Sequence, residues 1–258
     1  MIKIENTDVY GWEAAIRGMR NPMNSWDKSD TIYGTYYGKD DNGCEVFTKD
    51  GLKIGENDLA LMKKLSAAGT DHAKFLRMIN VTMDITAPLY WWKEFDTYKV
   101  GTVANSCSTM HKIQDKEFTL DDFSHEHLFE KDGIRYNCDI SFCVNEEYDV
   151  YWEPMDVLNA IVDSLNEARD RYFKIKYETM ENEQKRAETM KKYWWQMIQL
   201  LPSSYNQKRT VQLNYAVLKN MYFARRNHKL DEWHTFCDTV LSLPYFEAIC
   251  VDTEEAKE

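Results

Sequence analysis

Alternating apolar and polar positions define the clearest predicted strand of the chain, over residues 77–86. Four apolar residues share one face of it: Ile79, Val81, Met83 and Ile85. Polar residues occupy the positions between them, and a period of two over this length is typical of a strand with one buried face. Pro88 stands where a helix can begin, so we predict a helix over Leu89–Tyr98.

Residues 32–55 combine aromatic and β-branched residues with glycines, including Gly34, Gly38, Gly43 and Gly51, a composition that predicts a β-hairpin. Its turn is expected at Asp41-Asn42-Gly43, because Asn-Gly favours a tight hairpin turn. Asp58 then precedes leucines and a methionine at helical spacing. We therefore predict a helix with Asp58 as its N-cap that ends at Gly69.

The C-terminal half has helical periodicity. Four apolar residues form one stripe after Pro154: Leu158, Ile161, Val162 and Leu165. This stripe predicts a helical extension over 155–200, folded as an antiparallel pair with its polar segment near 181–188 exposed. Two further helices are expected near 207–225 and 229–241. The predicted fold class is α+β, a mixed sheet packed by helices, within one domain over 1–258.

Composition and charge limit the classes of partner. With 258 residues and 43% hydrophobic content, the chain is long enough to bury a core. The formal charge of -11 repels nucleic-acid polymers, and the densest basic runs are pairs such as Lys63-Lys64. A mononucleotide needs one or two arginines, so a small anionic ligand is compatible with this charge.

Six cysteines without a C-x-x-C pair, and no apolar leader, predict a cytoplasmic protein with reduced thiols. No stretch has the roughly twenty apolar residues of a membrane span. His125-Glu126-His127 with Glu130 brings metal-ligand residue types together. Their spacing matches no common metal site, so we predict no metal.

Two segments carry candidate binding or reactive residues, and each segment has a competing interpretation. Residues 101–109 form a small-residue segment that is expected to be either a ligand-binding loop or a plain connection. Within it, Cys107 is a candidate nucleophile or a buried thiol that packs as a small hydrophobe. Arg225 and Arg226, at a predicted helix end, either bind an anion or interact favourably with the helix dipole.

Several landmarks of the chain resemble the flavin-dependent thymidylate synthases in order and spacing. In that family a leucine-rich helix leads to a His, an alternating strand, Ala-Pro and another helix. The matching residues are His72, the strand over 77–86, Ala87-Pro88 and Lys93-Glu94-Phe95. Near the C-terminus, the family's Leu-Pro, Asn, Leu and Arg match Leu201-Pro202, Asn214, Leu218 and Arg225.

The family's signature is R-H-R, seven residues, Ser, one residue and Arg-Tyr. It falls on Thr97-Tyr98-Lys99, Cys107 and Thr109-Met110, so the spacing is kept while the arginines are replaced. Losing one charged hydrogen-bonding partner at such a site costs about 1.5–3 kcal/mol. Flavin binding is therefore expected to be weaker than in the family.

The resemblance implies roles for individual residues. The catalytic candidates are Cys107 and Glu94. The nucleotide-binding candidates are Arg225, Arg226, Ser106, Ser108 and Thr109. The flavin-binding candidates are His72, Thr97, Tyr98, Lys99 and Asn214. The family also implies FAD as cofactor and a homotetramer as the assembly.

Two functions follow from this resemblance. The first is a protein that binds a dUMP-like pyrimidine nucleotide and transfers a one-carbon unit to C5 with FAD. The second is a catalytically degenerate relative that serves as a nucleotide-binding or protein-interaction module, which the missing arginines favour.

Overall fold

The computed structural model describes residues 2–39, 45–128, 136–139, 149–178 and 182–255. These residues form two compact units. The first unit contains residues 1–3, 85–97 and 105–209, and the second contains residues 4–84, 98–104 and 210–258. The single-domain organisation stays a prediction, and the helical extension lies within the first unit.

A four-stranded sheet has the strand order β1-β4-β8-β5. Its strands are β1 (Lys3–Tyr10), β4 (Asn80–Pro88), β8 (Asn206–Asn214) and β5 (Val103–Ser106). Alternate residues of β4 are buried, including Val81, Met83 and Ile85, which confirms the predicted strand. The α+β class is confirmed as well.

Two elements of this sheet differ from the sequence-based expectation. Residues 206–214 form β8, so the predicted helix over 207–225 is wrong in its first half. Val211 and Leu213 are buried with period two, but polar neighbours conceal that signal in the sequence. The small-residue segment also contains a strand, β5, where a loop was expected.

In the second unit, β2 (Ile32–Lys39) and β3 (Glu45–Lys53) form the predicted antiparallel hairpin. Its predicted turn at Asp41-Asn42-Gly43 lies outside the described residues. Helix α2 (Glu56–Ala67) follows, with Gly55 as its N-cap. Gly69 comes after its end with φ +100°, a conformation that glycine adopts without strain.

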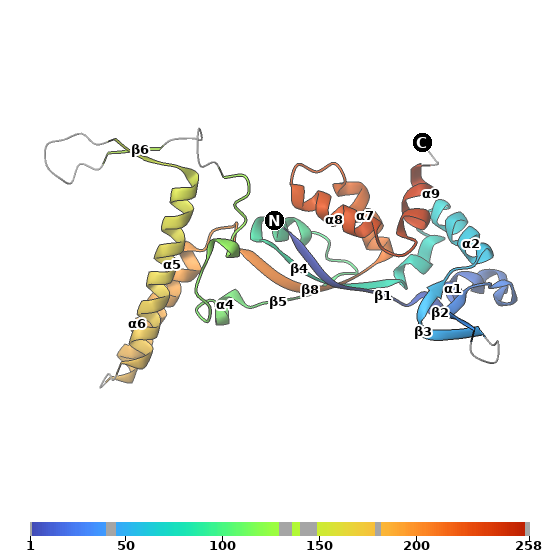
Figure 1. The fold of residues 1–258 in the computed structure, drawn as a ribbon, viewed down its shortest axis with the longest axis horizontal. Coiled ribbons are helices and arrows are strands. Elements are labelled where there is room, and N and C mark those ends of the chain that lie inside the picture. Colours follow the sequence, from blue (N-terminus) through green and yellow to red (C-terminus); the bar gives the residue numbers. More distant parts are fainter. Residues whose placement is uncertain (1, 40–44, 129–135, 140–148, 179–181, 256–258) are drawn as a thin grey trace. The chain divides into compact units, whose positions relative to one another are not determined.

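The other helices of the second unit pack around buried aromatic and aliphatic side chains. They are α1 (Trp12–Arg20), α7 (Tyr215–Arg225), α8 (Asp231–Leu241) and α9 (Asp252–Glu255). Short helical turns are η1 (Asn21–Met23), η2 (Trp26–Lys28), η3 (Ala73–Arg77) and η5 (Glu247–Val251). Helix α8 confirms the predicted helix over 229–241. Helices α7 and α8 lie side by side (Figure 1).

The first unit is built on a pair of long helices, α5 (Pro154–Tyr177) and α6 (Glu183–Leu200), which lie side by side (Figure 1). Leu158, Leu165 and Met197 are buried in one cluster, so the start of α5 packs near the end of α6. The predicted antiparallel pair is confirmed. Short elements complete the unit: α3 (Leu89–Phe95), α4 (Thr109–Lys112), η4 (Leu120–Asp122), β6 (Tyr136–Asp139) and β7 (Asp149–Trp152).

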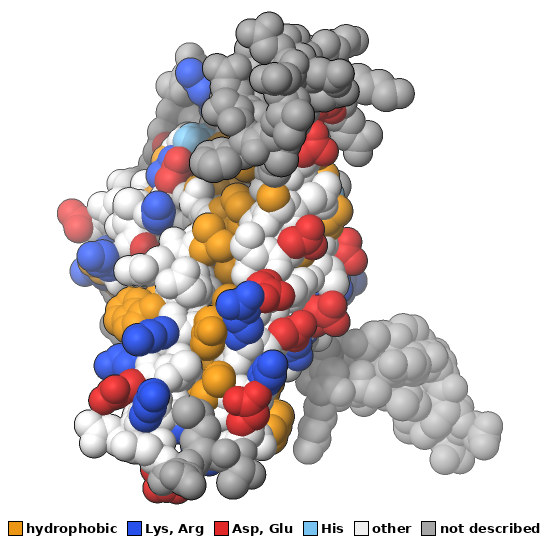
Figure 2. Space-filling model, turned by 90° about the vertical axis from the view of Figure 1, so that its left-hand side faces the viewer, with side chains coloured by type: hydrophobic (Ala, Val, Ile, Leu, Met, Phe, Trp, Pro, Cys, Tyr) orange, Lys and Arg blue, Asp and Glu red, His pale blue; other side chains and the backbone are white. Residues whose placement is uncertain are grey.

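Apolar side chains also reach the surface of this helix pair. Figure 2 shows the side of the molecule that carries α5 and α6, where an apolar stripe runs between acidic and basic side chains. Among the described residues of these helices, the exposed large apolar ones are Val157, Tyr177, Trp195 and Leu200. A surface of this kind is a candidate for contact with another chain.

Candidate functional site

The guanidinium of Arg225, at the end of α7, lies among aromatic rings of the second unit. Its Cζ is 4.8 Å from the ring centroid of Trp233 and 5.5 Å from that of Tyr98. Its Nε–H also donates a hydrogen bond of 2.9 Å to the Tyr98 hydroxyl. Tyr98, in the segment that matches the family signature, therefore contacts Arg225, which lies 127 positions later in the sequence.

A second contact joins the segment after Tyr98 to the start of α7. A Cβ at Gly101 would lie 2.9 Å from Cγ2 of Val217 and 3.2 Å from Nδ2 of Asn214. Gly101 has φ +79°, so a larger residue is excluded both by the backbone conformation and by this close approach. Asn214 itself caps α7, because its Oδ1 accepts a 3.1 Å hydrogen bond from the Val217 N–H.

Arg226 follows α7 and lines a cavity of about 510 Å³, which side chains of α8 also line. The cavity is lined further by Asn227, His228, His234 and Asp238, and by the buried Cys237. Ligand pockets for small molecules span about 300–1,000 Å³. The cavity is therefore large enough for a mononucleotide, with a cationic group at its wall.

Hydrogen bonds fix the proton positions of the two imidazoles. Nε2 of His234 lies 2.6 Å from the carbonyl oxygen of His228, which can only accept, so Nε2 of His234 carries a proton. Nδ1 of His228 accepts from the Leu230 N–H at 3.2 Å, so the neutral ring carries its proton on Nε2. The Nε2–H of His234 is thus used within the protein, by the His228 carbonyl.

Cys107 lies in the first unit, directly after β5. Its thiol is exposed, so the interpretation as a buried thiol is wrong. Its N–H donates to the Lys208 carbonyl at 2.9 Å, and its carbonyl accepts from Nε2 of Gln207 at 2.8 Å. These backbone contacts hold the segment against β8 and leave the sulfur accessible to solvent.

The neighbouring candidates of the first unit lie in or beside short helices and strands. Ser106 is an exposed residue at the end of β5. The Ser108 hydroxyl caps α4 by accepting from the His111 N–H at 3.0 Å, and Thr109 begins that helix. Glu94, in α3, accepts at its carbonyl a 2.7 Å hydrogen bond from the Thr97 hydroxyl.

Arg209 is a cationic group that the sequence analysis missed. Its Nη1 is 2.8 Å from Oδ1 of Asp96, its Nε donates to Oε1 of Gln207 at 3.0 Å, and its Cζ is 4.2 Å from the centroid of the Trp92 ring. Trp92 in turn donates to the Gln207 carbonyl at 2.9 Å. Arg209 lies on the same face of β8 as the buried Val211, and the weak alternation of this strand is the sequence signal for its position.

The predicted site residues fall into both units. The first unit holds Glu94, Thr97, Ser106, Cys107, Ser108 and Thr109, and the second holds His72, Tyr98, Lys99, Asn214, Arg225 and Arg226. Within the second unit, contacts join Tyr98 to Arg225 and Gly101 to Asn214, while His72 and Lys99 are exposed. That all twelve residues form one site stays a prediction.

The described residues contain neither a metal-binding cluster nor a helix that could span a membrane. In the part of the chain that the structure covers, no group of three or more His, Cys, Asp or Glu side chains is arranged to hold a metal ion. Glu130, the fourth member of the histidine-containing cluster, lies outside that part. No described helix has the length and apolar character needed to cross a membrane.

Comparison with known proteins finds similarity in structure but not in sequence. No family model and no curated protein matches the sequence. Two crystal structures of thymidylate synthase X from Helicobacter pylori with FAD and dUMP match with a TM-score of 0.56 and 14% identity. The matches cover 98% and 97% of this chain and 99% of each of those chains. This chain is therefore similar in fold to the flavin-dependent thymidylate synthases.

Proposed function

We propose that this chain is a thymidylate synthase-like protein that binds a pyrimidine mononucleotide such as dUMP. The observation that carries this proposal is the cavity beside Arg226, on a fold whose relatives were crystallised with dUMP. A guanidinium forms bidentate hydrogen bonds with phosphate oxygens. Arg226 is accordingly the phosphate-binding residue, and Arg225 supports the site through Tyr98 and Trp233.

The test is calorimetric titration of the protein with dUMP and with deoxyuridine, which lacks the phosphate. Arg226→Ala is expected to weaken dUMP binding about ten-fold to a hundred-fold, because a charged hydrogen bond contributes about 1.5–3 kcal/mol. Deoxyuridine binding should be the same in both proteins. Arg171→Ala, on the exposed surface of α5, is the matched control. Absence of any dUMP binding by the unmodified protein contradicts the proposal.

The residues assigned to flavin by resemblance fit FAD poorly. Lys99 alone carries a permanent positive charge for the diphosphate, while Thr97, Tyr98 and Asn214 use polar groups in contacts within the protein. A flavin-dependent transfer of a one-carbon unit to C5 of dUMP is therefore the less favoured form of the proposal. Purified protein with the visible absorption of a flavin, or with dUMP turnover, supports it.

The second candidate function is a catalytically degenerate relative that binds a nucleotide or a protein partner. The exposed apolar side chains on α5 and α6 favour it, since such surfaces mark interaction sites. Colourless protein that binds dUMP without turnover supports this candidate. Robust turnover of dUMP excludes it.

A further inference from the structure

Apolar side chains of both long helices reach the surface of the α5–α6 pair (Figure 2). On α5, Val157 and Ile175 are eighteen residues apart, which is five full turns, so they lie on one face of the helix. On α6, Tyr193 and Leu200 are seven residues apart, close to two turns. Val157 is 39% exposed and Leu200 is 40% exposed, while Ile175 and Tyr193 are half-buried and line one groove together.

Charged residues of α5 line this groove, which has a volume of about 460 Å³. Asp170, Lys174 and Glu178 are exposed and four residues apart, so they form one ridge with the charges minus, plus, minus. Asp170 lies 3.1 Å from the neighbouring Arg169, and Lys174 lies 3.9 Å from Glu178. Exposed ion pairs of this kind contribute little, so these charges can exchange partners at low cost.

Helix α6 carries the opposite pattern. Lys185, Glu188 and Lys192 are exposed and three or four residues apart, so they form a ridge with the charges plus, minus, plus. Glu188 accepts a 3.2 Å hydrogen bond from Nε2 of Gln184. Neither lysine forms an ion pair within the part of the chain that the structure describes.

The two ridges match in level along the helix pair. The helices are antiparallel, and the Arg171 guanidinium lies over the Tyr193 ring, 6.0 Å from its centroid. Counting from this contact in opposite directions, to within about two residues or about 3 Å along the axis, brings three pairs of opposite charge to the same levels: Asp170 and Lys192, Lys174 and Glu188, and Glu178 and Lys185.

We propose that this face of the α5–α6 pair packs against the same face of a second copy of the chain, about a two-fold axis parallel to the helices. Such an axis keeps every residue at its own level and brings α5 of each copy against α6 of the other. The α5 ridge of one copy then faces the α6 ridge of the other, and all three opposite-charge pairs form twice. The apolar residues lie between the two sets of charges, as in interfaces with an apolar centre and a polar rim.

The charge pattern selects this orientation. A two-fold axis across the helices, centred on the groove, would place α5 against α5. Asp170 would then face Glu178, and Lys174 would face the same lysine of the other copy, so like charges would meet. The contact requires only two copies and no nucleotide, so it stands apart from both the tetramer implied by the resemblance and the dUMP proposal.

The experiment is analytical ultracentrifugation of the full chain and of two charge-reversal variants. Asp170→Lys with Glu178→Lys reverses the α5 ridge, and Lys185→Glu with Lys192→Glu reverses the α6 ridge. Each variant alone should associate at least about ten-fold more weakly than the unmodified chain, because like charges then face each other. Association of the unmodified chain should also weaken as salt is added.

Mixing the two variants should restore association, since each reversed ridge then meets a ridge of opposite charge on the other variant. Asp71→Lys with Glu117→Lys changes the net charge as much as the α5 variant does, at exposed positions outside the groove, and should leave association unchanged. A monomeric unmodified chain overturns the proposal. So does association that both reversals leave intact, an equal loss in the control, or a mixture that stays dissociated.

Discussion

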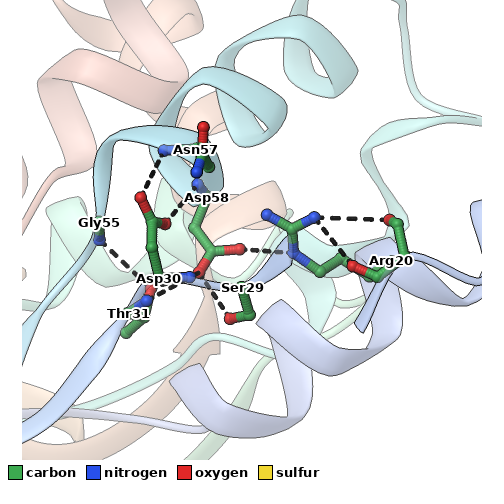
Figure 3. A network of polar contacts seen from close by, with 8 residues as sticks. Arg20, Ser29, Asp30, Thr31, Gly55, Asn57 and Asp58 are labelled. Atoms are coloured by element: carbon green, nitrogen blue, oxygen red, sulfur yellow. Dashed lines mark hydrogen bonds and ion pairs between the residues drawn. The ribbon is translucent and has the colours of Figure 1, made fainter. Parts of the chain in front are cut away.

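Asp58 is a buried carboxylate whose charge is stabilised by hydrogen bonds. Burial raises its pKa, but hydrogen bonds from Thr31, Ser29 and Arg20 outweigh that effect and hold the pKa below its ordinary value (Figure 3). A carboxyl with a lowered pKa stabilises the folded state above its unfolded pKa of about 3.9. That contribution is lost as the pH falls through the folded pKa.

We expect Asp58→Asn to lower the free energy of unfolding at pH 7 by about 3–5 kcal/mol, because it leaves Arg20 buried without its counter-charge. The loss should shrink as the pH is lowered below about 4, since protonation removes the same charge from the unmodified protein. Urea unfolding at several pH values measures both effects. Asp163→Asn, at an exposed position of α5, is the control; an equal loss there contradicts the explanation.

Cysteine reactivity should separate exposed from buried thiols. Burial raises the pKa of Cys237 to about 11 and that of Cys250 to about 12, so both stay protonated at neutral pH. Cys107 is exposed and should be alkylated by iodoacetamide first among these three. Peptide mass spectrometry of briefly labelled protein measures the order. Faster labelling of Cys237 or Cys250 contradicts the described packing.

At the scale of single residues, the sequence predicts types of group better than their partners. Asp58 was predicted to be a helix N-cap, but it lies within the first turn of α2, and it forms an ion pair with Arg20, 38 positions earlier. Arg225 is identified as a candidate, yet its contact with Tyr98 spans 127 positions. Partners at such distances are determined by the tertiary structure, which local sequence patterns do not contain.

The start of α7 offers a test at the scale of an element. Asn214 was predicted to bind flavin, and in the structure it caps the helix. Asn214→Ala should lower the free energy of unfolding by about 0.5–2 kcal/mol, and Asn214→Ser should restore most of the loss, because Ser is an equally good cap. Urea unfolding measures both variants. A Ser variant as unstable as the Ala variant argues against capping.

Elements with a strong period were predicted well, and those with a mixed pattern were not. The strand β4 and the helices α5 and α6 have clear apolar periods and appear as expected. The strand β8 alternates only weakly, because Gln207 and Arg209 occupy its inward positions. Their amide and guanidinium groups are satisfied by Cys107 and Asp96, contacts that only the folded chain provides.

Assembly is a question for the whole molecule. The resemblance predicts a homotetramer, and the exposed apolar side chains of α5 and α6 provide a surface for such contacts. Native mass spectrometry of protein purified from cells should show four copies, and it also detects any retained nucleotide or flavin. A monomer at micromolar concentration contradicts the tetramer.

The direct junction between β8 and α7 has a consequence for how this chain can change over time. Asn214 is the last residue of the strand and Tyr215 is the first residue of the helix, so no loop residue separates the two elements. Inserting one residue there would turn every side chain of α7 by roughly 100° about the helix axis. Arg225 would then lose its contacts with Tyr98 and Trp233, so we expect insertions and deletions to be selected against at this junction.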